Sequence, residues 1–309
     1  MTLASSFGVI AFTAFVWWFA TGVVLCLGRR PEGWHGVVML CLSVPAALSL
    51  GLAWALRDEA SVAGALAGYL AAVLLWAWHE AAFLLGYSTG PNRGPCPAGV
   101  GRATRFRLAW EALRDHEMAL LATVLLLAVM LHGAPNALAL HAFAALWVCR
   151  IAAKLCIFEG VPAMATEMMP ERLRYLQTYF GDRPPGVAFG LVVALLGAAT
   201  AWLARGAAEA TSMHAAVAHA LLATTVGLAL VEHLFLVLPV RDGRLWAWAM
   251  GFAREPEPAV DSAIKDDGNE GRAAPDTRRE AGAHAPRPGR RLHGVALRPR
   301  AVVARGRAP

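Results

Sequence analysis

The chain has 309 residues, of which 57% are hydrophobic and only 16% are charged, and its formal net charge is +6. Soluble domains carry about 25% charged residues, so this composition excludes an ordinary soluble protein and indicates an integral membrane protein. We therefore expect membrane lipid as a partner and no nucleic acid.

Seven apolar runs follow one another along the chain, each near the ~20 residues that an α-helix needs to cross a bilayer core of ~30 Å. They are residues 7–27, 34–56, 61–86, 119–134, 136–158, 185–203 and 213–240. The fourth run is short, and we expect its helix to begin nearer Asp115. The sequence thus predicts an all-α polytopic membrane protein with about seven transmembrane helices in residues 1–253.

The arginines of the loops predict how these spans are oriented, because Lys and Arg collect in cytoplasmic loops. With the N-terminus outside, the segments on the cytoplasmic side contain Arg29, Arg30, Arg93, Arg102, Arg105, Arg107, Arg114, Arg172, Arg174, Arg183, Arg241 and Arg244. The segments on the other side contain only Arg57 and Arg205. This alternation predicts an N-out, C-in orientation.

The first long cytoplasmic loop follows residue 86 and is rich in Gly and Pro, which predicts an irregular backbone. From about Ala103 the pattern becomes helical, with Phe106, Trp110 and Leu113 on one stripe. This segment fits a helix that lies in the headgroup layer and runs into the fourth span, or alternatively a solvated connector.

The second long loop contains Pro170, which suits the first turn of a helix. Residues 171–180 then place Leu173, Leu176 and Phe180 on one side, which predicts a second interfacial helix. Four residues of the two loops are predicted to form interaction surfaces: Cys96, Glu167, Tyr175 and Tyr179.

Charged and imidazole side chains within the apolar runs form the candidate site. They are His79 and Glu80, His116 and Glu117, Arg150 and Lys154, and Glu232 and His233. At ~1.5 Å rise per residue, the predicted topology brings all four sets to a common depth in the cytoplasmic third of the bilayer. Such residues usually face the interior of a helical bundle. Arg150 and Lys154 are four residues apart, so they share one helix face.

Three interpretations of this cluster remain open. It could be a charge-balanced group that fixes helix pairing and leaves no buried charge alone. It could be a ligand site in which an imidazole binds a metal, including the magnesium of a chlorin, and the adjacent acid orients it. It could also be an intramembrane metal-dependent hydrolase site, although HExxH is absent and adjacent His and Glu residues on a helix point about 100° apart.

Residues 254–309 differ from the rest of the chain, being rich in Pro, Gly, Ala, Arg and Asp. This composition predicts a disordered cytoplasmic tail. Its final part could adhere to anionic lipid or could be solvated without a specific role.

Three segments carry a family resemblance: WHEAAFLLGYSTGPNRGPCP at 78–97, LWVCRIAAKLCIFEGVPAMATEMMPERLRYLQTYF at 146–180, and LVEHLFLVLPVRDGRLWAW at 230–248. In this order and spacing the chain resembles PuhE, the photosynthetic complex assembly protein family of purple phototrophic bacteria, over residues 1–252. The chain departs from the family pattern at three positions, with Cys156 and Ala163 where Asn is expected and Arg172 where His is expected.

The resemblance implies a multi-pass protein of the bacterial inner or intracytoplasmic membrane that assists assembly of photosynthetic complexes. Its implied partners are reaction-centre or light-harvesting subunits and other assembly factors. The cofactor is unknown, and bacteriochlorophyll is the one candidate that the resemblance offers. It implies no catalytic residue and no defined metal. A non-enzymatic assembly factor is therefore the favoured function, and the alternative is a membrane-embedded metal-dependent hydrolase or a pigment- or lipid-modifying enzyme using the His/Glu cluster.

Overall fold

The computed structural model describes residues 3–163, 166–238 and 242–251. Within these ranges the secondary structure is helical, and pairing between extended segments is limited to one bridge between Gly160 and Asp182. The predicted tail at 254–309 lies outside the described residues, so its disorder stays a prediction.

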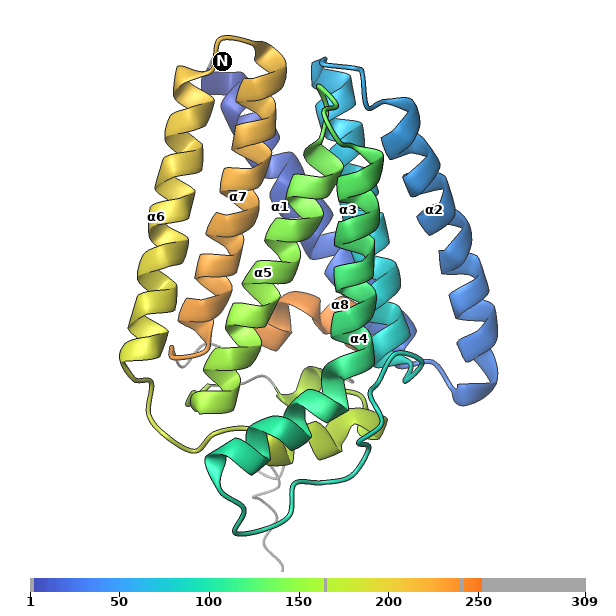
Figure 1. Cartoon of the computed structure of the whole chain (residues 1–309), viewed down its shortest axis with the longest axis vertical. Coiled ribbons are helices and arrows are strands. Elements are labelled where there is room, and N and C mark those ends of the chain that lie inside the picture. Colours follow the sequence, from blue (N-terminus) through green and yellow to red (C-terminus); the bar gives the residue numbers. More distant parts are fainter. Residues whose placement is uncertain (1–2, 164–165, 239–241, 252–309) are drawn as a thin grey trace, which may run out of the picture. The chain divides into compact units, whose positions relative to one another are not determined.

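Seven long helices form a bundle in the described part of the chain (Figure 1). They are α1 (Leu3–Gly28), α2 (His35–Ala55), α3 (Val62–Leu84), α4 (Arg102–Met130), α5 (Leu138–Glu159), α6 (Val187–Glu209) and α7 (Met213–Phe235). All of these except α4 are long and apolar enough to cross a membrane. The expectation of an all-α polytopic membrane protein is confirmed.

Helix α4 follows one of the two alternatives predicted from the sequence, because the segment from about Ala103 runs into the fourth apolar run as one continuous helix of 29 residues. Its first part runs obliquely below the bundle and its second part rises beside α3 and α5 (Figure 1). Arg114, Asp115 and Glu117 interrupt the apolar stretch. The charges explain why α4 does not reach the hydropathy of the other six, and its role as a seventh span stays a prediction, as does the N-out orientation.

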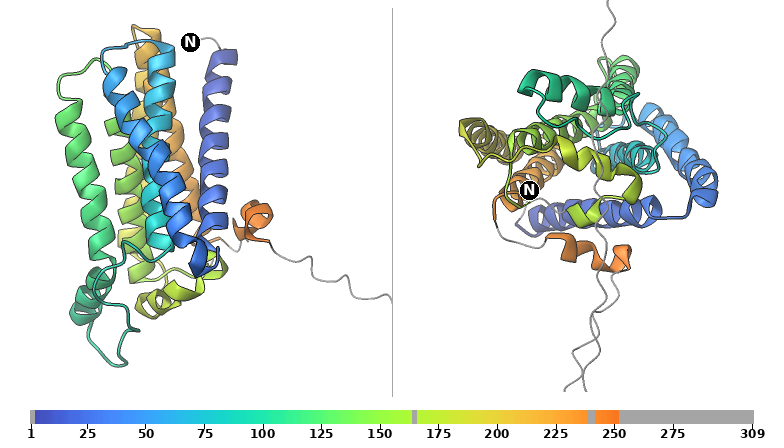
Figure 2. Two further views of the ribbon diagram at one scale, coloured as in Figure 1. Left: turned by 90° about the vertical axis from the view of Figure 1, so that its right-hand side faces the viewer. Right: turned by 90° about the horizontal axis from the view of Figure 1, so that it is seen from below.

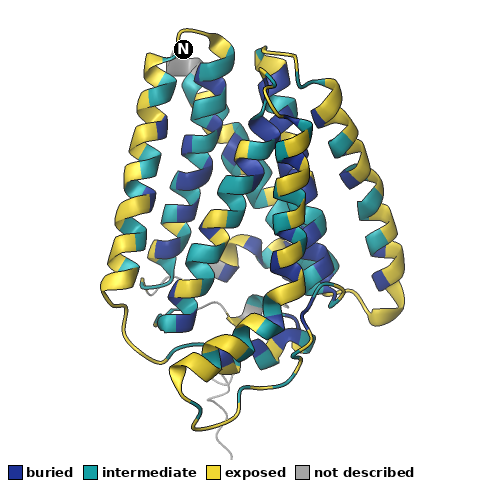
Figure 3. Ribbon diagram, in the orientation of Figure 1, coloured by how far each residue is buried: buried dark blue, intermediate teal, exposed yellow. Residues whose placement is uncertain are grey.

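Helix α3 lies at the centre and packs on α1, α2, α5 and α7. Small buried residues on α3, among them Gly64, Gly68 and Ala72, let the neighbouring helices approach closely. The fully buried rings of Tyr69 and Phe143 fill the space between α3 and its neighbours. The outward faces of α2 and α6 are exposed and apolar, as expected of helix faces that meet lipid (Figure 3).

The lower end of the bundle in Figure 1 carries most of the loop structure, and we refer to it as the predicted cytoplasmic end. It comprises the loop 85–101, four 3₁₀ helices, namely η1 (Glu32–Trp34), η2 (Thr166–Met168), η3 (Glu171–Tyr179) and η4 (Asp242–Trp246), and the short helix α8 (Ala247–Met250). Seen from below, η3 and the start of α4 lie across the helix ends (Figure 2).

The predicted second interfacial helix is a 3₁₀ helix rather than an α-helix. Leu173, Leu176 and Tyr179 are its buried residues, and their spacing of three matches the three residues per turn of a 3₁₀ helix. The prediction placed Phe180 on the buried stripe, whereas Tyr179 is buried and Phe180 is only partly so.

Candidate functional site

The polar residues predicted to share one depth come from four helices: α3 supplies His79 and Glu80, α4 supplies His116 and Glu117, α5 supplies Arg150 and Lys154, and α7 supplies Glu232 and His233. The structure joins the acids of α3 and α4 to the two cations of α5. The three histidines take separate positions.

Within the predicted cluster, two ion pairs hold α5 to its neighbours. Lys154 Nζ lies 2.5 Å from Glu117 Oε1, and the Trp147 indole N–H donates to Glu117 Oε2 at 2.9 Å. Arg150 Nη2 lies 3.5 Å from Glu80 Oε2. Because Arg150 and Lys154 are one helical turn apart, a single face of α5 neutralises a carboxylate on α3 and another on α4.

The histidines interact less with the carboxylates than the sequence interpretation assumed. His79 Nε2 forms a hydrogen bond with Thr123 Oγ1 at 2.8 Å, and its ring packs edge-on against Phe143. His116 is fully buried, and its Nε2 lies 3.7 Å from Glu80 Oε1, beyond hydrogen-bonding distance. The divergence of His79 from Glu80 follows from the rotation of about 100° between adjacent residues on a helix.

His233 is oriented by its own helix. Its Nδ1 lies 2.7 Å from the Ala229 carbonyl oxygen, which can only accept, so Nδ1 carries the proton. In the neutral ring Nε2 then holds a lone pair. This atom is buried and has no hydrogen-bond partner among the described residues.

A cavity of ≈ 380 Å³ lies beside the ion pairs, lined by residues of α1, α3, α5 and α7 and of the predicted cytoplasmic end. Its ionisable lining from the predicted cluster consists of Glu80, Arg150, Lys154 and Glu232. Much of the remaining lining is apolar or aromatic, including Trp17, Trp76 and Trp246. The predicted histidines do not line it, so a guest in this cavity would meet carboxylates and cations rather than imidazoles.

The arrangement does not supply the ligand set that a hydrolytic metal site needs. In the part of the chain that the structure describes, no group of three or more His, Cys, Asp or Glu side chains is placed to hold a metal ion. Structural and catalytic zinc sites use three or four such ligands. The metal-hydrolase alternative therefore gains no support from the geometry.

The predicted interaction residues of the two long loops join them together. Tyr179 OH accepts from the Asn92 amide at 2.8 Å and donates to the Gly94 carbonyl at 2.8 Å. The Cys96 backbone N–H donates to Thr178 Oγ1 at 2.7 Å. Tyr175 lines a separate pocket described below. The side chain of Glu167 lies outside the described residues, so its predicted role is not addressed.

Two sets of side-chain contacts were not predicted from the sequence. Trp147 supplies the second hydrogen bond to Glu117, and its position three residues before Arg150 on the same helix was the available signal. Trp18 and Trp246 form reciprocal bonds, in which the indole N–H of Trp18 donates to the Leu245 carbonyl and that of Trp246 donates to the Trp18 carbonyl, each at 2.9 Å. No local pattern indicates this contact, because it joins residues more than 220 positions apart.

The family described as "Protein of unknown function (DUF3623)" matches residues 3–257. The chain belongs to this family. It is also 35% identical over 254 residues to a protein of Rhodobacter capsulatus described as "Uncharacterized 30.4 kDa protein in puhA 5'region", a match that covers 80% of this chain and 92% of the relative. No solved structure matches the chain.

The DUF3623 match covers every predicted site residue, including the ion pairs, the cavity lining and both long loops. The relationship predicted from the three sequence segments is thus confirmed at the level of the family and of a relative from the puhA region. Most of the predicted tail lies beyond the matched range.

Proposed function

We propose that this protein is a membrane-embedded assembly factor for the bacterial photosynthetic apparatus, located in the inner or intracytoplasmic membrane. The observation that carries the proposal is the 35% identity, across most of both chains, to a protein named for the puhA 5′ region, which belongs to a photosynthesis gene cluster. The motif resemblance to the PuhE family supports the same assignment.

The working part of the protein, in this proposal, is the cavity beside the ion pairs. A volume of ≈ 380 Å³ falls within the range of about 300–1,000 Å³ typical of small-molecule sites. It suits part of a pigment or a few side chains of an assembling subunit, and it is too small to enclose a whole transmembrane helix. The mixture of charged and aromatic lining would suit an amphipathic guest.

Bacteriochlorophyll is one proposed guest, held by the charged and aromatic lining of the cavity rather than by an imidazole, because none of the predicted histidines lines it. Protein purified in mild detergent from phototrophic cells should then show a chlorin absorption band that Glu232→Gln weakens and that His79→Ala and His233→Ala retain. A colourless preparation would refute pigment binding and leave subunit binding as the proposed role.

The assembly proposal itself is tested by deleting the gene in the native phototrophic host. The expected result is lower reaction-centre and light-harvesting absorption per cell. Complementation with wild type should restore it, and complementation with Glu232→Gln, which alters the cavity lining, should restore it only partly.

The matched control is Arg205→Gln, which removes an exposed charge from α6 far along the chain from the cluster. It should complement fully, and membrane levels of each variant should be compared by immunoblot. Unchanged reaction-centre and light-harvesting absorption in the deletion strain would refute the proposal.

A further inference from the structure

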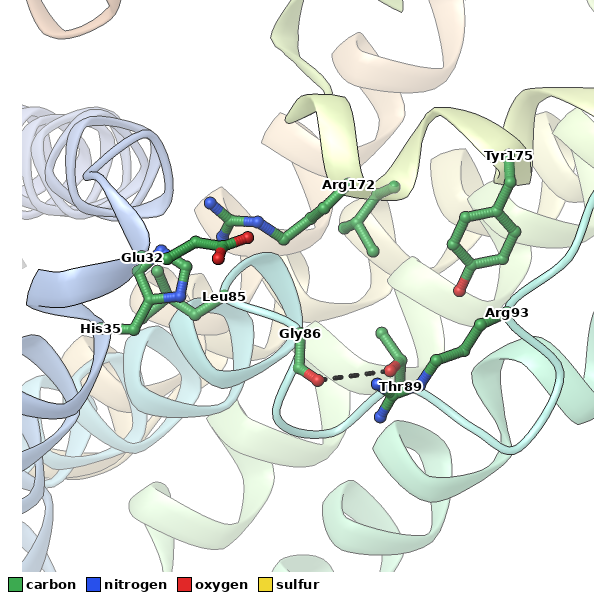
Figure 4. A pocket seen from close by; sticks show the side chains of 9 residues that line it. Glu32, His35, Leu85, Gly86, Thr89, Arg93, Arg172 and Tyr175 are labelled. Atoms are coloured by element: carbon green, nitrogen blue, oxygen red, sulfur yellow. Dashed lines mark hydrogen bonds between the residues drawn. The ribbon is translucent and has the colours of Figure 1, made fainter.

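A second pocket, of ≈ 250 Å³, lies at the predicted cytoplasmic end between the start of α2, the end of α3 and η3 (Figure 4). It is separate from the cavity that carries the proposed function, and no sequence motif pointed to it. Its polar lining comes from Glu32, His35, Thr89, Arg93, Arg172 and Tyr175.

The charge of this lining is predominantly positive. Arg93 and Arg172 contribute two guanidinium groups, and neither forms an ion pair with any residue that the structure describes. The acid in the lining is Glu32, which is exposed at the side of the pocket near His35 (Figure 4). Two cations against one carboxylate leave the pocket with an excess of positive charge.

Arg172 is held in place by backbone groups. Its Nη1 donates to the Leu84 carbonyl at 2.8 Å and to the Gly28 carbonyl at 3.4 Å. These carbonyls belong to the last turns of α3 and α1, where helices leave acceptors without intrahelical donors. A guanidinium has five N–H donors, so fixing one nitrogen orients the group and leaves other donors for a ligand.

Tyr175 presents a hydroxyl whose hydrogen-bonding capacity is unused. The oxygen is buried and has no partner within the described residues. Figure 4 shows it pointing toward the space beside Thr89 and Arg93. Burial is the main cause that raises the pKa of the Tyr175 phenol above its ordinary value, so at neutral pH the group is protonated and can donate. Buried polar groups normally have a hydrogen-bond partner, so the unpaired Tyr175 hydroxyl in a charged pocket indicates a group that binds a ligand.

We propose that this pocket binds a phosphate group, with Arg93 and Arg172 pairing with its oxygens and Tyr175 donating a hydrogen bond. Guanidinium groups match phosphate geometry and bind it through charge-assisted hydrogen bonds. The pocket lies where α1 and α3 end, at the level at which a bilayer presents phospholipid headgroups. The phosphate could belong to such a lipid or to a soluble anion, and both sources offer the same chemistry to these three side chains.

The test uses the full chain purified in detergent, with phosphatidylglycerol and inorganic phosphate as separate probes. Binding of phosphatidylglycerol is measured by native mass spectrometry, and binding of inorganic phosphate by the rise in thermal stability. Arg93→Gln is the main variant, because Arg93 is exposed and its removal breaks no ion pair among the described residues. We expect it to weaken binding at least ~10-fold, and Tyr175→Phe to weaken it several-fold.

The matched control is Arg174→Gln, which removes an equal charge from η3 at a position that pairs with Glu171 and does not line the pocket. It should leave binding unchanged. If phosphatidylglycerol stays bound in millimolar inorganic phosphate, the ligand is a lipid headgroup; if inorganic phosphate binds alone and displaces it, the ligand is a soluble phosphate. Binding that is equal in wild type, Arg93→Gln and Tyr175→Phe, or that falls equally in Arg174→Gln, would overturn the proposal.

Discussion

Replacing Lys154 by methionine should lower the free energy of unfolding by about 3 kcal/mol. The Lys154 Nζ to Glu117 Oε1 distance is 2.5 Å, and the two side chains are 24% and 7% exposed. Removing one partner of a buried ion pair costs about 3–5 kcal/mol, because the remaining charge is left without compensation. The lower value applies here, since Trp147 still donates to the other oxygen of Glu117.

The double variant Lys154→Met/Glu117→Gln provides a sharper test. It should recover most of the loss, because no unpaired charge remains and the glutamine oxygen can still accept from Trp147. The control is Arg205→Gln on α6, whose partner Glu209 is 62% exposed. Exposed pairs contribute about 0–1 kcal/mol, so this variant should stay near wild type.

Unfolding in mixed micelles titrated with SDS, followed by tryptophan fluorescence, measures these differences. The analogous loss at Arg150 should be smaller, since its distance to Glu80 is 3.5 Å and its side chain is 47% exposed beside the cavity. Two results would refute the argument: Lys154→Met within about 1 kcal/mol of wild type, or a double variant as unstable as the single one.

Three further variants test contacts at the predicted cytoplasmic end by the same unfolding assay. Tyr179→Phe removes the hydroxyl that bridges two groups of the first loop, so it should cost about 1–3 kcal/mol and speed proteolysis of residues 87–101; equal cleavage rates would contradict this. Trp246→Phe removes one of the reciprocal indole bonds with Trp18 and should cost about 1–2 kcal/mol, whereas no change would mean that the bond adds nothing net. Gly22→Ala places a Cβ against the ring of Trp248 and should cost about 1–3 kcal/mol, and a neutral result would show that the ring moves aside freely.

The number and position of the long helices could be predicted because each long apolar run indicates a helix that is buried in lipid or protein. The depth of the charged residues could also be predicted, since rise per residue is fixed along a helix. That common depth allows the acids of α3 and α4 to meet the cations of α5. The structure contains these contacts as the ion pairs Glu80–Arg150 and Glu117–Lys154. The depth of a residue along its helix, however, does not determine how that helix is rotated about its axis.

That rotation explains what the sequence left undetermined. Whether Thr123 of α4 meets His79 or Glu80 depends on how α3 is turned toward α4, and only packing decides this. The same holds for the 3₁₀ geometry of η3, because apolar residues at 173, 176 and 179–180 fit both helix types. The contact of η4 and α8 with α1 has no periodic signal, since both elements are too short to show one.

The reciprocal bonds between Trp18 and Trp246 have a consequence for the order in which the protein is made. Helix α1 is completed by contacts with η4, whose Trp246 is made 228 residues after Trp18. At synthesis rates of about 5–20 residues per second, α1 waits roughly 10–50 seconds for that partner. During this interval the aromatic face formed by Trp17 and Trp18 is open to lipid, to the insertion machinery or to another nascent chain.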